Sequence, residues 1–564
     1  MARLTPWQMV VEALKAEGID RVFGLPGNPL HFVADLKQHS DIKPVLVRHE
    51  HSGATLAYAT ARTTGRPAVC FTNPGPGITN LATALLEATC GSLPVIALSN
   101  GVPLSTDGMG AFQELDSVAL MRPVTKWATR VVDPQTTPWV MQRAFSLAKN
   151  GRPGAVFIDL PSDIALQNCA MPAYRPSGAR HRSRPDPEAL TAAAQIIASV
   201  KQPVIVCGSG AVSATAGALI ISLAQSLGGA LFSTPGGRGT YPEDHPLCLG
   251  QIGLYFTQAG KQYFDDADLV ISVGSRLEDF STGGWTLWPK KAKLIQIDID
   301  PGMIGLNIRP DAALVGDAAL AVADLLQTLP STHSKGVHER RKKINRLHTN
   351  FVSKIQRTAN KQKKPISPKQ VVNAVNRIFG KDTIMVHENG GADLWSYYWP
   401  YYQVLNAGDC IPMAEQTAMG MGVIGAIGAK IARPDKKVVC VTGDGALQMA
   451  MMELATAVEQ RCGITWVVLN NQALGWPQYI QRLEKQPDIA TEFSHSPDFT
   501  KLATAQGCKG IKVTDPAKVD AALKSAMKAN QAGTPVLIDI HIAKHDYPPH
   551  FTTFHREVWG LGKK

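Results

Sequence analysis

The chain has 564 residues, of which 45% are apolar and 18% charged, and its formal net charge at pH 7 is +11. At about 150 residues per domain, this length predicts roughly three or four domains with the composition of an ordinary α/β protein. No apolar run could span a bilayer, and the N-terminal residues read as an amphipathic helix rather than a signal peptide. The nine cysteines lack CxxC spacing, which favours reduced thiols. We therefore expect a cytoplasmic protein without a membrane partner.

Much of the positive charge lies between residues 335 and 364, including the runs 340–343 and 361–364. Such a run is usually a solvated helix face or a linker. Neither an aromatic-interleaved basic platform nor zinc-ligand spacing accompanies it, so we expect no nucleic-acid partner. An anionic substrate or cofactor accounts equally well for the positive bias.

Short apolar strands alternate with helical segments along the whole chain, which predicts parallel sheets with crossover helices. The predicted strands of the first third are 21–23, 44–47, 68–71, 95–98 and 155–158. A polar stretch rich in Pro and Arg, 176–187, then reads as a linker. The predicted strands of the rest are 204–207, 269–273, 294–299, 438–442, 464–469 and 536–540.

The predicted fold class is α/β, with three doubly wound parallel-sheet domains in series. The domains are expected at residues 1–175, 188–330 and 367–545, with a basic linker at 331–366 and a C-terminal tail at 546–564. The middle domain carries Gly208-Ser209-Gly210, a partial dinucleotide-type turn whose third glycine position is Ser213. A tight strand-to-helix turn is the favoured interpretation. If a flavin or nucleotide binds outside the main site, this domain is where we expect it.

The most informative stretch begins where strand 438–442 enters Gly443-Asp444-Gly445. A segment with helical periodicity, 448–458, follows, and strand 464–469 then ends in Asn470-Asn471. In a strand–helix–strand crossover both strands point the same way, so Asp444 and Asn471 should meet at the carboxyl edge of the sheet. A carboxylate and an amide oxygen beside a glycine turn suit a hard cation that bridges to a phosphate. A plain structural turn is the alternative for the motif in isolation.

This spacing resembles the thiamine diphosphate motif. The resemblance implies that Asp444, Asn471 and the backbone carbonyl of Ala473 hold Mg²⁺ against the cofactor diphosphate. It also implies a carboxylic acid that shares a proton with the aminopyrimidine ring of the cofactor, and a lone carboxyl in an apolar cleft would have the raised pKa that this role requires. Glu50, just after strand 44–47, is the candidate. An exposed strand-end acid paired with Arg48 is the alternative.

Taken together, the motifs resemble the acetohydroxyacid synthase, pyruvate oxidase and benzaldehyde lyase superfamily of thiamine diphosphate enzymes. The first third is similar to its pyrimidine-binding domain, through the segments 24–27, 48–50, 73–80 and 111–114, and the last third to its diphosphate-binding domain. The resemblance implies catalytic roles for Glu50, Gln113 and Met419, of which Met419 is the residue that bends the cofactor. The residues that it implies for cofactor binding are Pro26, Gly75, Asn80, Gly390, Gly391, Thr417, Met419, Gly443, Asp444, Gly445, Ala446 and Asn471.

Two positions depart from the family pattern. Thr417 stands where relatives usually have glycine, which puts the local backbone geometry in question. Ile480 stands where acetohydroxyacid synthases carry a tryptophan of the acceptor pocket, and Trp476 lies four residues earlier.

The substrate pocket is expected to include His31, Phe112, Trp476, Ile480 and His550. The C-terminal histidines could close over the site as proton donors, although such a tail is more often a surface strap. Trp395, Tyr397 and Tyr398 are expected either along an aromatic approach to the site or in dimer-interface packing.

The resemblance implies a thiamine diphosphate- and Mg²⁺-dependent carboligase or lyase that acts on 2-oxo acids or 2-hydroxy ketones through an enamine intermediate. A non-ligating 2-oxo acid decarboxylase is the first alternative, followed by acetolactate synthase proper and a flavin-dependent oxidase. A cofactor-free regulatory homologue is disfavoured because Glu50, Asp444 and Asn471 are all intact. By the same resemblance, the active sites lie at the subunit interface of a homodimer or of a dimer of dimers.

Overall fold

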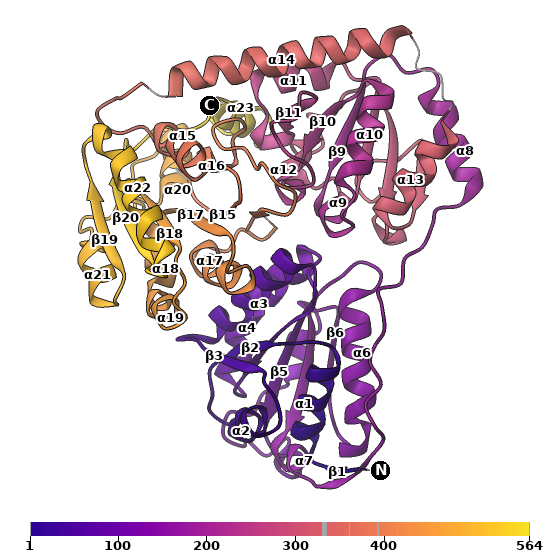
Figure 1. The fold of residues 1–564 in the computed structure, drawn as a ribbon, viewed down its shortest axis with the longest axis vertical. Coiled ribbons are helices and arrows are strands. Elements are labelled where there is room, and N and C mark those ends of the chain that lie inside the picture. Colours follow the sequence, from indigo (N-terminus) through magenta and orange to yellow (C-terminus); the bar gives the residue numbers. More distant parts are fainter. Residues whose placement is uncertain (1, 330–334, 360, 392–393, 414, 563–564) are drawn as a thin grey trace. The chain divides into compact units, whose positions relative to one another are not determined.

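The computed structural model describes residues 2–329, 335–359, 361–391, 394–413 and 415–562 (Figure 1). Its strands form three six-stranded parallel sheets and one small antiparallel pair, β1 (Ala2–Leu4) with β8 (Cys169–Met171). The prediction of three parallel-sheet α/β domains in series is therefore confirmed. In the described part of the chain, no helix is long and apolar enough to cross a membrane.

The first sheet has the order β3-β2-β4-β5-β7-β6. Its strands are β2 (Arg21–Gly24), β3 (Lys43–Leu46), β4 (Ala68–Thr72), β5 (Val95–Gly101), β6 (Trp127–Arg130) and β7 (Val156–Pro161). The helices around it are α1 (Pro6–Ala16), α2 (Leu30–His39), α3 (Glu50–Thr64), α4 (Pro76–Cys90), α5 (Ser117–Met121), α6 (Thr137–Lys149) and α7 (Ser162–Ala165). Thr5 and Gln8 form a capping box that begins α1.

The central sheet has the order β11-β10-β9-β12-β13-β14. Its strands are β9 (Pro203–Cys207), β10 (Ala230–Ser233), β11 (Cys248–Gln251), β12 (Leu269–Val273), β13 (Lys293–Asp298) and β14 (Ala312–Val315). Its helices are α8 (Pro187–Ile197), α9 (Ser209–Ser213), α10 (Gly217–Leu227), α11 (Gln258–Asp265), α12 (Asp279–Thr282) and α13 (Ala318–Thr328). The predicted basic linker contains the 25-residue helix α14 (Lys335–Ala359). Figure 1 shows α14 running past α10 and β11 toward α15, all of which it contacts.

The third sheet has the order β16-β15-β17-β18-β20-β19. Its strands are β15 (Thr383–His387), β16 (Cys410–Ile411), β17 (Lys437–Gly443), β18 (Thr465–Asn470), β19 (Lys509–Val513) and β20 (Val536–His541). The helices are α15 (Pro368–Phe379), α16 (Leu394–Tyr397), α17 (Met421–Ala432), α18 (Asp444–Ala450), α19 (Leu454–Glu459), α20 (Gly475–Leu483), α21 (Phe499–Ala505), α22 (Val519–Gln531) and α23 (Pro549–Glu557).

The strand orders divide the sheets into two kinds. With the strands of each sheet counted in chain order, the first and third sheets both run 2-1-3-4-6-5, whereas the central sheet runs 3-2-1-4-5-6. The central order is that of dinucleotide-binding domains, whose ligands bind where the strand order reverses. In this sheet the reversal lies between β9 and β12, which puts the Gly208 turn at that point.

Three predictions about local structure need correction. The segment 448–458 is not one helix, because a 3₁₀ turn at Met451–Glu453 separates α18 from α19. The predicted C-terminal tail folds as the helix α23 rather than as an extended strap. Trp395, Tyr397 and Tyr398 are only 1–3% exposed and pack in the core, so they line no open approach.

The chain divides into two compact units, which differ from a simple partition by sequence. The first unit contains residues 1–181 together with 415–434 and 450–460, because α17 packs closely on α3. A Cβ atom on Gly428 would lie 2.7 Å from the carbonyl oxygen of Leu56, so the absence of a side chain lets the two helices approach. The second unit contains the central sheet and the third sheet. The predicted domain limits at 175, 188, 330 and 366 stay predictions.

Candidate active site

Asp444 and Asn471 lie together at the carboxyl edge of the third sheet, as their sequence context predicts. β17 and β18 are parallel neighbours, and Gly443 at the end of β17 is in register with Leu469 near the end of β18. The next residues along each strand are therefore adjacent in space. Asp444 is 1% exposed and Asn471 5% exposed, so both side chains are buried at the point where they meet.

Three oxygen atoms converge at this point. The side-chain oxygen of Asn471 lies 3.0 Å from Asp444 Oδ1 and 2.9 Å from the carbonyl oxygen of Ala473. Rotating the Asn471 amide would turn both contacts into N–H···O hydrogen bonds. A cation between the three oxygens would satisfy them equally well, because neighbouring ligands of an octahedral Mg²⁺, at about 2.0–2.1 Å from the ion, are about 2.9 Å apart. The spacing alone therefore fits the rotated amide and the cation equally well, and other groups at the site bear on the choice of the cation.

The second oxygen of Asp444 favours the cation. Asp444 Oδ2 is buried and has no hydrogen-bond partner among the residues that the structure describes, an arrangement that costs free energy unless a ligand satisfies it. Burial raises the pKa of Asp444 to about 7, although backbone N–H groups of Asn471 and Gln472 oppose the shift. Within the described residues, no cluster of three or more His, Cys, Asp or Glu side chains could hold a metal. A site with one carboxylate, one amide and one carbonyl suits Mg²⁺ or Ca²⁺ rather than zinc.

The glycines around this edge have two different surroundings. A Cβ atom on Gly443 would meet no atom within 4 Å, so the space beside the turn is open. A Cβ on Gly391 would lie 2.8 Å from the ring of Tyr547 and 3.0 Å from the backbone nitrogen of Trp476, so Gly391 is packed against α20. Of the other predicted cofactor residues, Gly445 and Ala446 lie in the first turn of α18, and Gly390 directly precedes Gly391.

Glu50 is the first residue of α3 and is 9% exposed. Its Oε2 accepts a hydrogen bond of 2.9 Å from the side-chain amide of Asn80, so the carboxyl is not a lone group. A Cβ on Gly77 would lie 2.4 Å from Thr72 Oγ1 and 3.5 Å, an ordinary contact distance, from Glu50 Oε1. The alternative of a pair with Arg48 is wrong. The Arg48 guanidinium binds Glu459, and its backbone N–H donates to Glu453.

Gly75 and Gln113 adjoin each other in the first unit. Both have positive φ angles, 58° and 64°, and a Cβ on Gly75 would lie 3.0 Å from Gln113 Cβ. Phe112, beside Gln113, is 86% exposed. Pro26 and His31 are also exposed, in the loop before α2 and at the start of that helix. The structure thus brings Gly75 and Gln113 together and places Phe112 at the surface of the unit.

Thr417 adopts a left-handed backbone conformation, with φ of 53°. A β-branched residue rarely takes this conformation, whereas glycine takes it freely, which gives a physical reason for the glycine that the resemblance implies here. The role of Thr417 in cofactor binding stays a prediction. Met419 is partly buried, two residues before α17, and belongs with Glu50 to the first unit.

Trp476 on α20 faces the C-terminal helix. Its indole N–H donates to His555 Nε2 at 2.9 Å, while His555 Nδ1 binds the carbonyl of Phe551, and burial lowers the pKa of His555. His555 is one of the C-terminal histidines that are expected to close over the site, and its contact with Trp476 does not follow from the sequence pattern alone. The i, i+4 spacing of Phe551 and His555 on an aromatic helix was the available signal. Ile480 is partly exposed one turn beyond Trp476.

His550 lies away from Trp476, against the ring of Phe256 in the central domain at 5.9 Å. Burial lowers its pKa to about 4, with a further contribution from Lys261, so the imidazole is neutral at pH 7. Its buried Nε2 has no hydrogen-bond partner. A proton-donating role for this histidine stays a prediction.

Comparisons with known proteins identify the same three parts of the chain. Residues 5–120 match the N-terminal TPP binding domain of thiamine pyrophosphate enzymes, residues 190–325 the central domain and residues 390–540 the C-terminal TPP binding domain. A probable acetolactate synthase large subunit of Methanocaldococcus jannaschii is 33% identical over 555 residues, 95% of this chain and 91% of that protein. The acetolactate synthase of Mycobacterium bovis is 32% identical over 562 residues, 96% of this chain and 88% of that protein. The chain belongs to the thiamine pyrophosphate enzymes.

Proposed function

We propose that this chain is a Mg²⁺-dependent carboligase that transfers an acyl unit from a 2-oxo acid to a second carbonyl compound. The observation that carries the proposal is the convergence of the Asp444, Asn471 and Ala473 oxygens beside an unpartnered carboxylate oxygen. The names of the relatives, acetolactate synthases, support ligation over simple decarboxylation.

In this proposal the three oxygens would hold Mg²⁺, which would supply the positive charge that offsets the diphosphate of the cofactor. Asp444 supplies the negative charge, while Asn471 and Ala473 supply neutral oxygens, so most of the electrostatic attraction depends on one residue. Gly443 leaves the space beside the turn free for phosphate oxygens, and the first backbone N–H groups of α18 have no partner within the helix and would be available as donors.

Glu50 holds and moves a proton in the proposed mechanism. Its carboxyl is positioned by the Asn80 amide, which leaves the second oxygen, beside Gly77, to share a proton with a ring nitrogen of the cofactor. The bound cofactor supplies the carbon nucleophile and the electron sink. Burial keeps water from competing for that proton. Gln113 and Met419 are proposed to contact the substrate side and the bent cofactor, as the family resemblance implies.

The acceptor pocket is proposed to differ from that of the acetolactate synthases. Ile480 replaces the tryptophan expected there, and the Trp476 indole is engaged by His555 and lies 5.0 Å from the ring of Phe551. Trp476 is therefore held in the contact between α20 and α23. We propose that the acceptor pocket has more room than the family tryptophan would permit. The acceptor in this proposal is an aldehyde.

Product analysis tests this function. The holoenzyme, loaded with thiamine diphosphate and Mg²⁺, is incubated with ¹³C-labelled pyruvate and an excess of aldehyde, and the products are identified by NMR. We expect a 2-hydroxy ketone with the aldehyde and a smaller amount of 2-hydroxy-2-alkyl acid with pyruvate alone. Accumulation of free acetaldehyde without any ligated product would identify a non-ligating decarboxylase and overturn the proposal.

Glu50→Gln should lower the rate by about 100- to 10,000-fold. Glu339→Gln, which changes an exposed acid on α14, is the matched control.

The active site is proposed to be shared between two copies of the chain, with Glu50 and Asp444 contributed by different subunits. Glu50→Gln and Asp444→Ala homodimers should each be inactive. Co-expression of the two variants should restore part of the activity, because one site of each mixed dimer then contains both wild-type residues. Failure of mixed dimers, verified by differential tags, to regain activity would place both residues in one subunit.

A further inference from the structure

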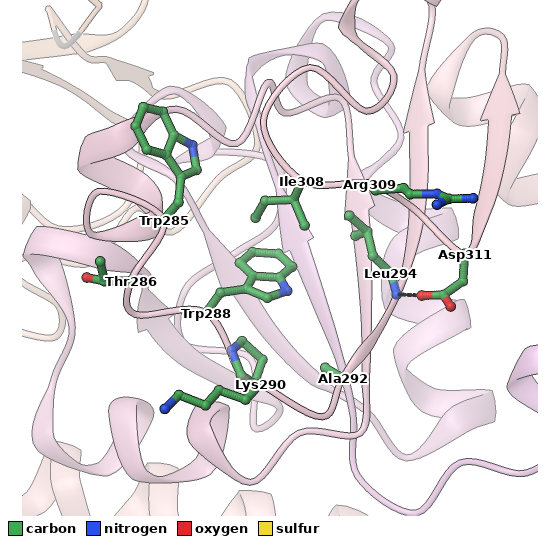
Figure 2. A pocket seen from close by; sticks show the side chains of 10 residues that line it. Trp285, Thr286, Trp288, Lys290, Ala292, Leu294, Ile308, Arg309 and Asp311 are labelled. Atoms are coloured by element: carbon green, nitrogen blue, oxygen red, sulfur yellow. Dashed lines mark hydrogen bonds between the residues drawn. The ribbon is translucent and has the colours of Figure 1, made fainter.

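A cavity of about 540 Å³ lies in the central domain, and none of the residues that line it is assigned above to the active site. It opens at the amino ends of β13 and β14, since Leu294 is near the start of β13 and Asp311 directly precedes β14. The Gly208 turn lies at the opposite, carboxyl edge of the same sheet. The residues that line the cavity are Trp285, Thr286, Trp288, Pro289, Lys290, Ala292, Leu294, Ile308, Arg309 and Asp311 (Figure 2).

Trp285 at the rim of this cavity has an unusual backbone. Its φ is 60°, directly after Gly283 and Gly284 with φ of 63° and 58°. A bulky residue in this conformation is strained, and such strain concentrates at functional sites. Burial in the core does not explain why a tryptophan stands at this position, because Trp285 is 49% exposed.

The hydrogen bond of the Trp285 indole orients its ring, and the carbonyl group that accepts this bond has a second donor. Its indole N–H donates to the carbonyl oxygen of Leu277 at 3.0 Å. The same oxygen accepts a second hydrogen bond of 3.2 Å from the side-chain amide of Asn307. Leu277 would therefore keep a partner if the indole were removed. The ring is held in place, but the fold does not depend on it.

The centre of the cavity lining is a second tryptophan. Figure 2 shows Trp288 in the middle of the lining, with Trp285 above it, Lys290 below it and Arg309 beyond Leu294; the charged ends of Lys290 and Arg309 point outward in this view. Trp288 is partly buried, and its ring rests on Phe264 at 5.8 Å, which fixes it as a floor. The cavity thus presents aromatic surface at its base and at its rim.

The charge of the cavity is positive. Lys290 and Arg309 are exposed, and neither forms an ion pair or side-chain hydrogen bond in the part of the chain that the structure describes. Asp311 is the single acid in the lining, and its Oδ2 already accepts the backbone N–H of Leu294 at 2.8 Å. Two cations without counter-charges at a cavity lined by two tryptophans suit a ligand that is both aromatic and anionic.

We propose that this cavity binds a planar aromatic anion of the size of a mononucleotide. The volume falls within the range of about 300–1,000 Å³ that is usual for small-molecule pockets. The ring would stack on the tryptophans, and its phosphate or carboxylate would pair with Lys290 or Arg309. This inference does not rest on the proposed carboligase function, because the cavity shares no residue with that site.

Calorimetric titration of the holoenzyme with AMP, at fixed ionic strength and with thiamine diphosphate and Mg²⁺ already bound, tests the proposal. Adenosine lacks the phosphate and ribose 5-phosphate lacks the base, so each should bind at least about tenfold more weakly than AMP. Trp285→Gly should weaken AMP binding by about 5- to 150-fold, the usual effect of losing one stacking ring. Its melting temperature should stay the same or rise, because glycine takes a φ of 60° without strain.

The double variant Lys290→Gln/Arg309→Gln should also lose affinity for AMP, and both residues are exposed, so folding is not at risk. Matched controls are Trp139→Ala, another exposed tryptophan at 57%, and Lys354→Gln/Arg357→Gln on α14, which should bind AMP as the wild type does. Absence of AMP binding to the wild type, or equal affinity in the double variant, would overturn the proposal. So would equal binding of AMP and ribose 5-phosphate, which would indicate a plain anion site. Capture of a macromolecule on this face without AMP competition would also contradict it.

Discussion

Two glycine turns in this molecule have nearly the same sequence pattern and opposite surroundings. Gly208-Ser209-Gly210 follows β9 in the central sheet, and Gly443-Asp444-Gly445 follows β17 in the third sheet. A Cβ atom on Gly208 would lie 2.2 Å from the carbonyl oxygen of Gly274, so protein backbone occupies the space. A Cβ on Gly443 would meet nothing within 4 Å.

The difference shows that a glycine after a parallel strand has two physical reasons to be there. At Gly208 the missing side chain lets two loops pack. Gly274, in the second of these loops, has φ of 60° and lies against Gly210. At Gly443 the missing side chain leaves room beside a buried carboxylate whose Oδ2 has no partner. The first turn should therefore matter for stability, and the second for ligand binding.

The largest expected effect lies at the open turn. Asp444→Ala should weaken binding of thiamine diphosphate with Mg²⁺ by on the order of 100-fold or more, because the only carboxylate of the oxygen cluster is lost. Asn471→Ala removes a neutral ligand and should cost about tenfold. Equilibrium dialysis of the cofactor against each variant, at saturating Mg²⁺, measures both effects.

The stability of Asp444→Ala sharpens the comparison. Its melting temperature without cofactor should not fall, because the variant removes a buried carboxylate oxygen that has no hydrogen-bond partner. Ca²⁺ should replace Mg²⁺ in the wild type. Tight cofactor binding by Asp444→Ala in the presence of a chelator would show that the anchoring scheme is wrong.

A paired glycine substitution compares the two turns directly. Gly208→Ala should lower the free energy of unfolding by about 1–3 kcal/mol, since the new methyl group overlaps the Gly274 carbonyl and backbone must move. Gly443→Ala should leave stability within about 0.5 kcal/mol while weakening the cofactor, because its methyl group enters space that the diphosphate is proposed to use. Chemical denaturation and cofactor titration are measured on the same two proteins.

Gly65→Ala is the control for the cost of backbone conformation alone, since Gly65 has φ of 68° and no atom within 4 Å of its Cβ position. If Gly443→Ala destabilised the protein more than Gly208→Ala did, the contrast between a filled turn and an open turn would not hold.

Part of the fold and of the candidate site could be predicted from the sequence. The order and type of the main strands followed from apolar runs between turn residues, and the meeting of Asp444 with Asn471 followed from the geometry of parallel strands. These features depend on local pattern and on one topological rule. Strands of two to five residues were not all predicted, because so few residues carry too little periodicity to identify a strand; those of the three parallel sheets that did not follow from the sequence are β6, β10, β11, β14, β15, β16 and β19.

Side-chain partners were also out of reach of the sequence. Arg48 was weighed as a partner of Glu50, but it binds Glu459, more than 400 positions away. Asn80 was assigned to the cofactor, and the structure shows that its amide holds Glu50. The break between α18 and α19 depends on tertiary packing in the first unit, where Glu453 accepts the Arg48 N–H. Contacts over such separations are decided by the fold, which local pattern does not contain.

The smallest effect concerns His51, whose imidazole is partly buried. Burial, with a contribution from His49, lowers its pKa from the ordinary value of 6.5 to about 4. The unfolded chain therefore takes up a proton at higher pH than the folded chain does. The stability that His51 contributes is complete above pH 6.5 and is lost as the pH falls from there toward 4. Between pH 7.5 and 5.5 the loss in the free energy of unfolding should be about 1 kcal/mol.

Denaturation of wild type and His51→Gln across this pH range measures the difference. The control is His49→Asn, which keeps a capping side chain for α3. Parallel pH profiles for wild type and His51→Gln would mean that the imidazole is solvated, and that burial by protein at this helix is incomplete.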